Sequence, residues 1–159
     1  MKIKIYIETT VVSYYTSPFS RDLVIAGHQQ ATRDFWMKAG KDFEAYISAL
    51  VIKEAGRGDN VQAKKRLDVI ASFSVLDINA EAESLAGCIV AGGGISDKFP
   101  EDALHIAIAA VNGINVIVTW NFAHLNNPFT RMMIRQIVEN EGYICPEIVS
   151  PDELLGEEP

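Results

Sequence analysis

The chain has 159 residues, of which 48% are hydrophobic and 22% are charged. That length suits one domain of ordinary size, and that composition excludes a disordered chain, a collagen-like fibre and a disulfide scaffold. The formal net charge of −7 argues against sequence-blind binding of nucleic acid over the whole surface. A local nucleic-acid site is still compatible with this charge, because a metal ion can invert the local field.

No apolar run approaches the roughly 20 residues that a membrane span needs. The N-terminus alternates polar and apolar residues, so it lacks the continuous apolar core of a secretory signal. The two cysteines, Cys88 and Cys145, stand in apolar contexts without a second cysteine or a histidine at metal-ligand spacing. We therefore expect reduced thiols in a cytoplasmic protein that has no membrane partner.

The first half of the chain begins with a strand. Alternating isoleucines predict this strand over residues 2–7. A helix over residues 20–39 follows, with Ser20 as its N-cap, and then a strand over 43–47. Ser48 caps the next helix, which runs to about Ala55, and Asp59 or Asn60 caps the helix after it. The apolar face of that last helix is expected to hold Val61, Leu67, Ile70 and Ala71.

The second half continues with a strand over residues 74–78 and a helix over 80–91, which Asn79 precedes. Gly92–Gly94 follow this helix rather than a strand, so they indicate helix termination and not a phosphate-binding loop. The remaining patterns predict a helix from Pro100 to about Val111, a strand over 114–119, a helix that begins at Asn127-Pro128 and stops at Gly142, a strand over 144–149, and a turn at Ser150-Pro151.

Strands and helices thus alternate from end to end. This order predicts an α/β fold in which helices cover both faces of a central, mostly parallel sheet. We expect one domain over residues 1–155 and a disordered acidic tail over residues 156–159.

Polar residues stand near the ends of the expected strands. Glu8 follows the first strand, Glu54 lies just beyond the second, Asp102 lies in the first turn of a helix, and Thr119 and Asn121 follow a later strand. A parallel sheet would gather them in one crevice at the carboxyl ends of its strands. Such carboxylates repel one another unless a cation joins them, and hard oxygen ligands match Mg²⁺ or Mn²⁺. The pattern therefore predicts metal-dependent phosphoester chemistry.

At these residues the sequence resembles a known family. The segments Tyr6–Ser13, Ser48–Glu54, Pro100–Ala110 and Val118–Phe122 resemble those of PIN domains, in the same order, and most closely the VapC-like toxins of bacterial type II toxin–antitoxin systems. The resemblance implies a PIN-like three-layer sandwich. It also implies an endoribonuclease dependent on Mg²⁺ or Mn²⁺ that hydrolyses RNA with a metal-activated water. As partners it implies a cognate antitoxin protein and a second copy of the chain, which would form a homodimer.

Matched residue by residue, the resemblance assigns Glu8, Glu54, Asp102 and Asn121 to the catalytic, metal-binding positions, with Thr119 in support. The family usually has Asp where this chain has Glu8 and Asn121. The longer Glu8 would move the ion or bend, and Asn121 removes a negative charge. The alternative function is therefore a PIN-like module that binds RNA or protein and whose catalysis is weakened or lost. A small-molecule phosphohydrolase is a third possibility, but Glu8 replaces the nucleophilic Asp that it would need.

Each candidate also has a purely structural interpretation. Glu8 can be solvated or can cap the next helix, and Glu54 can be an exposed residue near the end of a helix, where a negative charge is mildly unfavourable. Asp102 suits a helix N-terminus without any function, and Asn121 suits a turn. His105 shares a helical face with Asp102 and is interpreted as a satisfied, partly buried histidine, although it can approach the crevice. His124 is interpreted as a surface histidine.

Basic and aromatic residues offer further contacts. Arg57, one turn beyond Glu54, and the pair Arg131 and Arg135 are better candidates for phosphate contacts than the cluster Lys64–Arg66, which is typical of a solvated helix face. The aromatic residues Tyr14, Tyr15 and Phe19 are expected in core or dimer packing, with base stacking as the alternative.

Overall fold

The computed structural model describes residues 2–156. Most of the expected acidic tail, residues 157–159, lies outside the described residues. Within residues 2–156, no helix is long and apolar enough to cross a membrane.

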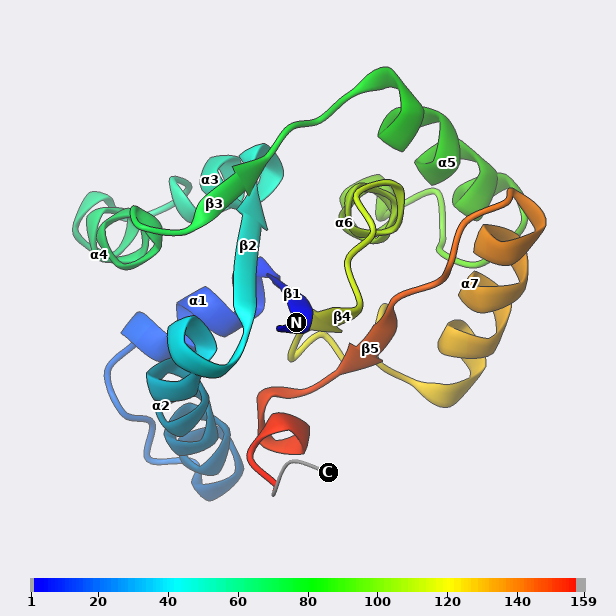
Figure 1. The fold of residues 1–159 in the computed structure, drawn as a ribbon. Helices are drawn as coiled ribbons and strands as arrows, with labels where there is room; N and C mark the ends of the chain where they lie inside the picture. Colours follow the sequence, from blue (N-terminus) through cyan, green and yellow to red (C-terminus); the bar gives the residue numbers. More distant parts are fainter. Residues whose placement is uncertain (1, 157–159) are drawn as a thin grey trace.

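A five-stranded sheet runs through the middle of the molecule (Figure 1). Its strands are β1 (Lys4–Ile7), β2 (Glu44–Ser48), β3 (Ser74–Leu76), β4 (Val116–Val118) and β5 (Glu147–Val149). All neighbouring strands are parallel, in the order β3-β2-β1-β4-β5. In this register Tyr6 of β1 pairs with Tyr46 of β2 on one side and with Ile117 of β4 on the other. The parallel sheet that the sequence predicts is therefore confirmed.

Helices cover both faces of this sheet (Figure 1). On one face lie α1 (Thr9–Thr16), α2 (Leu23–Asp42), α3 (Ala49–Ala55) and α4 (Asn60–Ile70), and on the other lie α5 (Ala80–Ala91), α6 (Pro100–Val111) and α7 (Pro128–Asn140). A short 3-10 helix, η1 (Pro151–Leu154), follows β5. The direction of strand addition reverses after β3, and right-handed crossovers then place the later helices on the opposite face. This is the three-layer α/β architecture that the sequence predicts.

One helix is missed and one expected helix cap is wrong. The sequence analysis does not identify α1, which begins at Thr9, because its Thr, Val and Tyr residues are typical of strands. Ser20 does not cap α2. Asp22 does, because its carboxylate accepts hydrogen bonds from the backbone N–H groups of Val24 and Ile25, at 3.0 Å each. The two short side chains lie close in sequence, and only the backbone geometry decides between them.

The expected apolar face of α4 is right only in part. Ile70 is buried as expected, but Val61 is 62% exposed and Leu67 is 36% exposed, and Ala63 is buried in their place. The cap of this helix is Asp59, whose carboxylate accepts from the backbone N–H of Gln62. The helix therefore turns a smaller face to the core than its apolar residues suggest.

Several local predictions are confirmed. Ser48 caps α3 by accepting from the backbone N–H of Val51, and Asn79 caps α5 in the same way. The glycine run ends α5, and Gly93 has a φ of +80°, which glycine adopts without strain. A Cβ on Gly92 would lie 2.8 Å from the side chain of Ile137, so these glycines let α7 approach closely and do not form a phosphate loop.

The core is built around β1 and α6. Ile5, Tyr6 and Ile7 are completely buried between the two helical layers. Tyr14 stacks against Trp120, and Tyr15 contacts Trp36 edge-on, so both belong to the packing of the first layer. Phe19 is half exposed instead, with the guanidinium of Arg33 above its ring.

The two cysteines are free thiols. Cys145 is buried, and this burial raises the pKa of its thiol to about 11. A thiol with so high a pKa is unreactive near neutral pH, which agrees with the expectation of a structural cysteine.

Candidate functional site

The central strands β1 and β4 are neighbours, and the chain leaves them toward opposite faces of the sheet (Figure 1). In open α/β sheets, such a switch point opens a crevice at the carboxyl ends of the strands. Glu8 comes directly after β1, and Thr119 comes directly after β4. Their backbones continue the sheet, because the N–H of Glu8 donates to the carbonyl of Val118 at 3.1 Å. The first candidate carboxylate is thus fixed by the centre of the sheet.

Neutral donors hold the carboxylate of Glu8, which is only 4% exposed. Its Oε1 accepts from the hydroxyl of Thr10 at 2.5 Å and from the hydroxyl of Thr119 at 2.6 Å. Its Oε2 accepts from the backbone N–H of Thr10 at 3.1 Å, which also caps α1. The capping interpretation of Glu8 is therefore correct, and it does not exclude a second role, because these donors leave the negative charge uncancelled.

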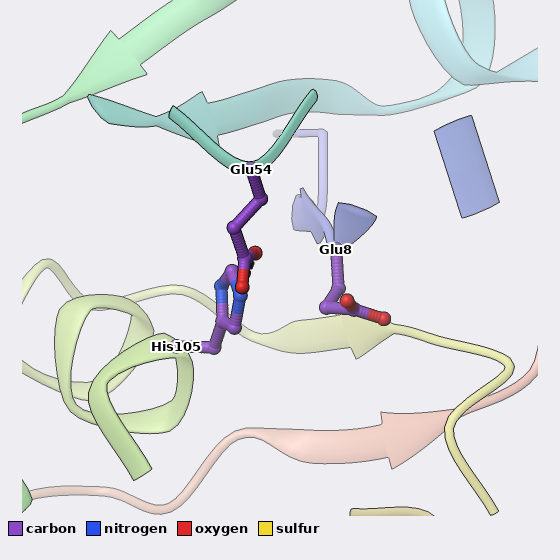
Figure 2. A group of neighbouring side chains, drawn as sticks. All are labelled: Glu8, Glu54 and His105. Atoms are coloured by element: carbon purple, nitrogen blue, oxygen red, sulfur yellow. Dashed lines mark hydrogen bonds and ion pairs between the residues drawn. The ribbon is translucent and has the colours of Figure 1, made fainter. Parts of the chain in front are cut away.

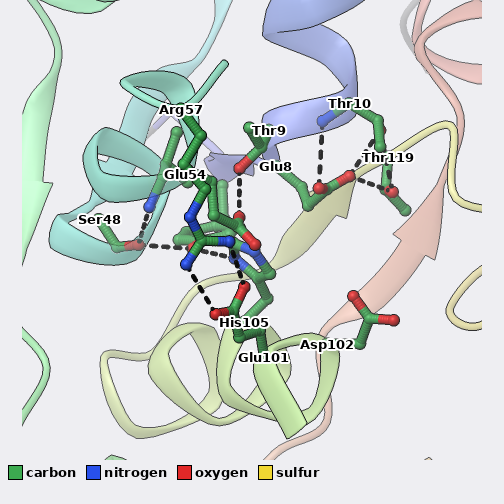
Figure 3. Close-up of polar contacts among 12 residues, drawn as sticks. Glu8, Thr9, Thr10, Ser48, Glu54, Arg57, Glu101, Asp102, His105 and Thr119 are labelled. Atoms are coloured by element: carbon green, nitrogen blue, oxygen red, sulfur yellow. Dashed lines mark hydrogen bonds and ion pairs between the residues drawn. The ribbon is translucent and has the colours of Figure 1, made fainter. Parts of the chain in front are cut away.

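A histidine and a hydroxyl hold the carboxylate of Glu54, near the end of α3. Its Oε1 accepts from Thr9 Oγ1 at 2.6 Å and lies 2.6 Å from Nε2 of His105 (Figure 3). Burial alone would raise the pKa of Glu54, but the hydrogen bond and the charge of His105 outweigh it and lower the pKa to about 2. Glu54 is therefore ionised throughout the neutral and mildly acidic range.

His105 stands at the centre of a buried chain of hydrogen bonds. Its Nδ1 lies 2.6 Å from the hydroxyl of Tyr6, and that hydroxyl lies 2.7 Å from Ser48 Oγ. Burial acts to lower the pKa of His105, but the hydrogen bond to Glu54 and the nearby carboxylate charges raise it overall. Burial also raises the pKa of Tyr6 far above its usual range, so its hydroxyl stays neutral. The chain joins β1, β2, α3 and α6, and it fixes the orientation of Glu54.

Glu8, Glu54 and His105 form one compact group (Figure 2). Each offers a ligand atom, and these atoms all lie within 4.8 Å of one another. The sequence correctly predicts that the polar atoms of His105 are satisfied, but the side chain is fully rather than partly buried, and its contact with Glu54 is not predicted. The sequence signal that could have indicated this contact is the position of His105, one helical turn after Asp102 on a helix that faces the crevice.

Asp102 lies at the rim of the crevice and is not part of the group of Glu8, Glu54 and His105. Its Oδ2 is 3.0 Å from Nδ1 of His124, whose ring stacks on Phe99 at a centroid distance of 3.8 Å. Burial raises the pKa of Asp102, and the charges of His105 and His124 oppose this rise. His124 is thus not merely a surface histidine, because it contacts a candidate carboxylate.

Asn121 acts as a turn residue in the loop after β4. Its Oδ1 accepts from the backbone N–H of His124 at 3.0 Å, and its own N–H donates to Thr119 Oγ1 at 2.9 Å. The structural interpretation of Asn121 is therefore correct. Thr119 links the two sides of the site, since its hydroxyl contacts both Glu8 and the loop of Asn121.

A pocket of about 260 Å³ opens beside the group. Its lining residues are Glu54, Lys98, Phe99, Pro100, Glu101 and Asp102. Glu54 thus belongs both to the buried group and to the wall of the pocket that Asp102 also lines. Of the arginines considered as phosphate contacts, Arg57 pairs with Glu101 at this pocket, whereas Arg131 and Arg135 line a separate hollow along α7.

The donor set fits a hard divalent ion. Carboxylate oxygens are the ligands that Mg²⁺ and Mn²⁺ prefer. Glu8 and Glu54 offer two such ligands within 4.8 Å of each other, and Asp102 lines the pocket that Glu54 also lines. Both ring nitrogens of His105 already have hydrogen-bond partners. We therefore assign His105 to holding Glu54 rather than to binding the ion.

Comparison with known proteins agrees with this architecture. No family model matches the sequence, and no curated protein matches it. Among solved structures, a chain in the crystal structure of VapBC2 from Rickettsia felis bound to a DNA fragment from their promoter is similar, with a TM-score of 0.59 and 14% sequence identity. The match covers 93% of this chain and 98% of that chain. The likeness shows the fold alone, which is PIN-like, as in VapC.

Proposed function

We propose that this chain is a metal-dependent endoribonuclease that hydrolyses phosphodiester bonds in RNA. The observation that carries the proposal is the meeting of Glu8 and Glu54, which are 46 positions apart in the sequence, in one group whose ligand atoms lie within 4.8 Å. Asp102 faces the same pocket as Glu54. A PIN-like fold supports the proposal, because its crevice stands where these carboxylates converge.

Glu8, Glu54 and Asp102 would hold Mg²⁺ or Mn²⁺, and Asn121 would complete the site directly or through water. When bound, such an ion offsets the charge of the phosphate and lowers the pKa of a coordinated water. The chain's own residues keep the carboxylates ready for this role. Thr10 and Thr119 orient Glu8, and His105 keeps Glu54 deprotonated. Such supporting contacts typically change metal affinity or activity 10- to 100-fold, as an order of magnitude.

The second candidate is a PIN-like module that binds RNA or protein with weakened or lost catalysis. It is favoured because both carboxylates of the group already have hydrogen-bond partners within the chain. The charge of Glu54 is balanced by His105, and Glu8 has three donors from its own chain. Such a group can stand without an ion.

Partners follow from the same likeness. The similar solved structure is a VapBC2 complex bound to promoter DNA. We propose an antitoxin protein as a partner of this chain, a homodimer as its assembly, and the cytoplasm as its location.

An Asp102→Ala variant tests the proposal. It should abolish Mn²⁺-dependent cleavage of single-stranded RNA while leaving the fold intact, as measured by gel assays and by circular dichroism. The matched control is Asp97→Ala, which removes an exposed carboxylate shortly before α6. An Asp102→Ala variant that cleaves RNA as fast as its parent contradicts the proposal.

Calorimetry separates the two candidates. The nuclease should bind Mn²⁺, and both Glu8→Gln and Glu54→Gln should weaken this binding. If the parent protein binds no Mn²⁺ at millimolar concentration, the non-catalytic binding module is the better interpretation.

A further inference from the structure

The proposed site has to bind a polyanion in acidic surroundings. Three carboxylates, Glu54, Glu101 and Asp102, line the pocket together with a single lysine, Lys98. Glu8 belongs to the same group as Glu54, and the whole chain carries a net charge of −7. One divalent ion offsets two of these charges. Lys98 offsets only one of the three lining carboxylates. A phosphodiester that enters the pocket therefore needs a further cationic side chain nearby, because desolvation and the acidic field make an unpaired phosphate unfavourable.

Arg57 is placed to meet this need. It follows Gly56, which ends α3, and its backbone N–H donates to the carbonyl of Glu54 at 3.1 Å. Arg66 of α4 fixes this segment, because its Nε donates to the carbonyl of Ala55 at 2.8 Å and its Nη2 donates to the carbonyl of Arg57 at 2.5 Å. The backbone of Arg57 is thus anchored, while its side chain remains 52% exposed.

The side chain of Arg57 reaches from the end of α3 to the first turn of α6 (Figure 3). Its Nη1 donates to Glu101 Oε2 at 3.1 Å and its Nη2 donates to Glu101 Oε1 at 2.9 Å. The hydrogen bonds and charge of Glu101, together with the more distant charge of Glu54, raise the pKa of Arg57. The fork of the arginine is thus already set in the bidentate geometry that suits a carboxylate or a phosphate.

We propose that Arg57 is a phosphate-binding residue of this site and that Glu101 pairs with its guanidinium in the absence of RNA. A phosphodiester next to the cleaved bond replaces the carboxylate of Glu101 on the same two N–H groups. The exchange is easy because an exposed ion pair contributes little to stability. This inference rests on the proposed nuclease function and adds to it the residue that receives the substrate backbone.

A second ion pair provides a matched control. Arg135 Nη2 lies 2.8 Å from Glu147 Oε1, and the exposed fractions of these side chains, 42% and 65%, resemble the 52% and 38% of Arg57 and Glu101. This pair joins α7 to β5, along the separate hollow described above. Arg135 is also a phosphate contact that the sequence allows, so it stands as the rival to Arg57.

The test measures RNA binding as a function of salt. An Asp102→Asn background in the presence of Mn²⁺ keeps a fluorescein-labelled single-stranded RNA uncleaved, and fluorescence anisotropy gives its affinity. Arg57→Gln should weaken binding and reduce the slope of log affinity against log salt by about 0.7, the value for one phosphate contact to a single strand. Arg57→Lys keeps the charge, so it should keep the slope and lose only part of the affinity. Arg135→Gln should change neither quantity.

Steady-state kinetics of the otherwise unchanged chain supply the second measurement. Arg57→Gln should raise KM several-fold with little change in kcat. Glu101→Gln should lower KM, and most of this gain should vanish in the double variant Arg57→Gln/Glu101→Gln, because the released arginine is then absent. Circular dichroism checks that each variant folds.

Any of four outcomes overturns the inference. If Arg57→Gln and Arg135→Gln change the salt slope equally, or if Glu101→Gln lowers KM as much without Arg57 as with it, the effect is one of general charge. A parent protein that cleaves RNA while Arg57 shows no specific effect refutes the role of Arg57 and leaves the nuclease proposal standing. A parent that neither cleaves nor binds RNA refutes both.

Discussion

Glu8 and Glu54 lie at the same edge of the sheet, but different kinds of partner hold their carboxylates. Glu8 follows the central strand β1 and accepts hydrogen bonds from two threonine hydroxyls and a backbone N–H. Glu54 lies on α3 and pairs with His105, which reaches it from α6 on the other side of the sheet. The first carboxylate is held by neutral donors alone, and the second by a threonine hydroxyl and a histidine whose pKa is raised.

This difference separates the two tasks of a site that gathers acidic groups. Neutral donors orient a carboxylate and leave its charge free to attract a cation. A histidinium balances one charge, and it thereby allows two carboxylates to lie close together before any ion binds. The three predictions that follow remove one kind of partner at a time.

The largest effect is expected from removing the charged partner. His105 is 1% exposed, and both of its ring nitrogens have partners. The His105→Leu variant leaves Glu54 without its counter-charge, and loss of one member of a buried pair costs about 3 kcal/mol or more. Urea denaturation at pH 5.5 in the presence of EDTA measures this loss.

The control for that variant is His105→Gln, which keeps an N–H that can reach Glu54 and should lose clearly less stability. If His105→Leu lowers the free energy of unfolding by less than about 1 kcal/mol, the pair does not hold the fold together.

The second prediction concerns pH. The pKa of Glu54 is about 2 in the folded chain against 4.5 for an unperturbed glutamate. Its contribution to stability is therefore complete above about pH 4.5 and is lost as the pH falls through 2. The pKa of His105 is raised above 6.5, so its contribution is complete below pH 6.5 and is lost as the pH rises through the higher folded value.

Urea midpoints between pH 2 and pH 9 test this dependence. The His105→Leu variant should lose both the fall in stability at low pH and the fall at high pH, because it lacks the histidine and leaves Glu54 without its partner. A Thr119→Val variant should keep both pH-dependent losses of stability, since the Thr119 hydroxyl contacts Glu8, Thr10 and the backbone N–H of Asn121 but neither Glu54 nor His105. Equal pH profiles for the parent and His105→Leu would contradict the ion pair.

The smallest effect is expected at the neutral partner. Thr119→Val preserves shape but removes the hydroxyl that donates to Glu8 at 2.6 Å, while Thr10 still holds the same oxygen. We expect a loss of about 1.5 kcal/mol in stability, typical of one hydrogen bond to a charged group. We also expect a fall of about tenfold in Mn²⁺ affinity by calorimetry, as for outer-shell contacts.

The control is Thr16→Val, whose hydroxyl donates to the carbonyl of Val12 within its own helix. It should change stability by less than about 0.5 kcal/mol and leave Mn²⁺ affinity unchanged. Unchanged Mn²⁺ affinity in Thr119→Val would argue against Glu8 as a ligand.

Local signals were sufficient for most elements. Alternating isoleucines predicted β1, and short polar caps predicted the starts of α3 and α5, because a strand face and a helix cap depend on neighbouring residues alone. The same reasoning failed for α1, whose residues are typical of strands, and for α4, whose exposed Val61 looked like a core residue. In both cases packing against other elements outweighs local preference.

The sequence by itself determined the alternation of strands and helices, and therefore the parallel sheet and the edge at which Glu8, Glu54 and Asp102 had to be sought. Only the tertiary structure decided that His105 pairs with Glu54, that Asp102 stands at the rim beside His124, and that Arg57 reaches Glu101. The physical reason is range. Strand period and helix caps act over a few residues, whereas these contacts join side chains 22 to 51 positions apart, and their distances depend on how the helical layers pack on the sheet.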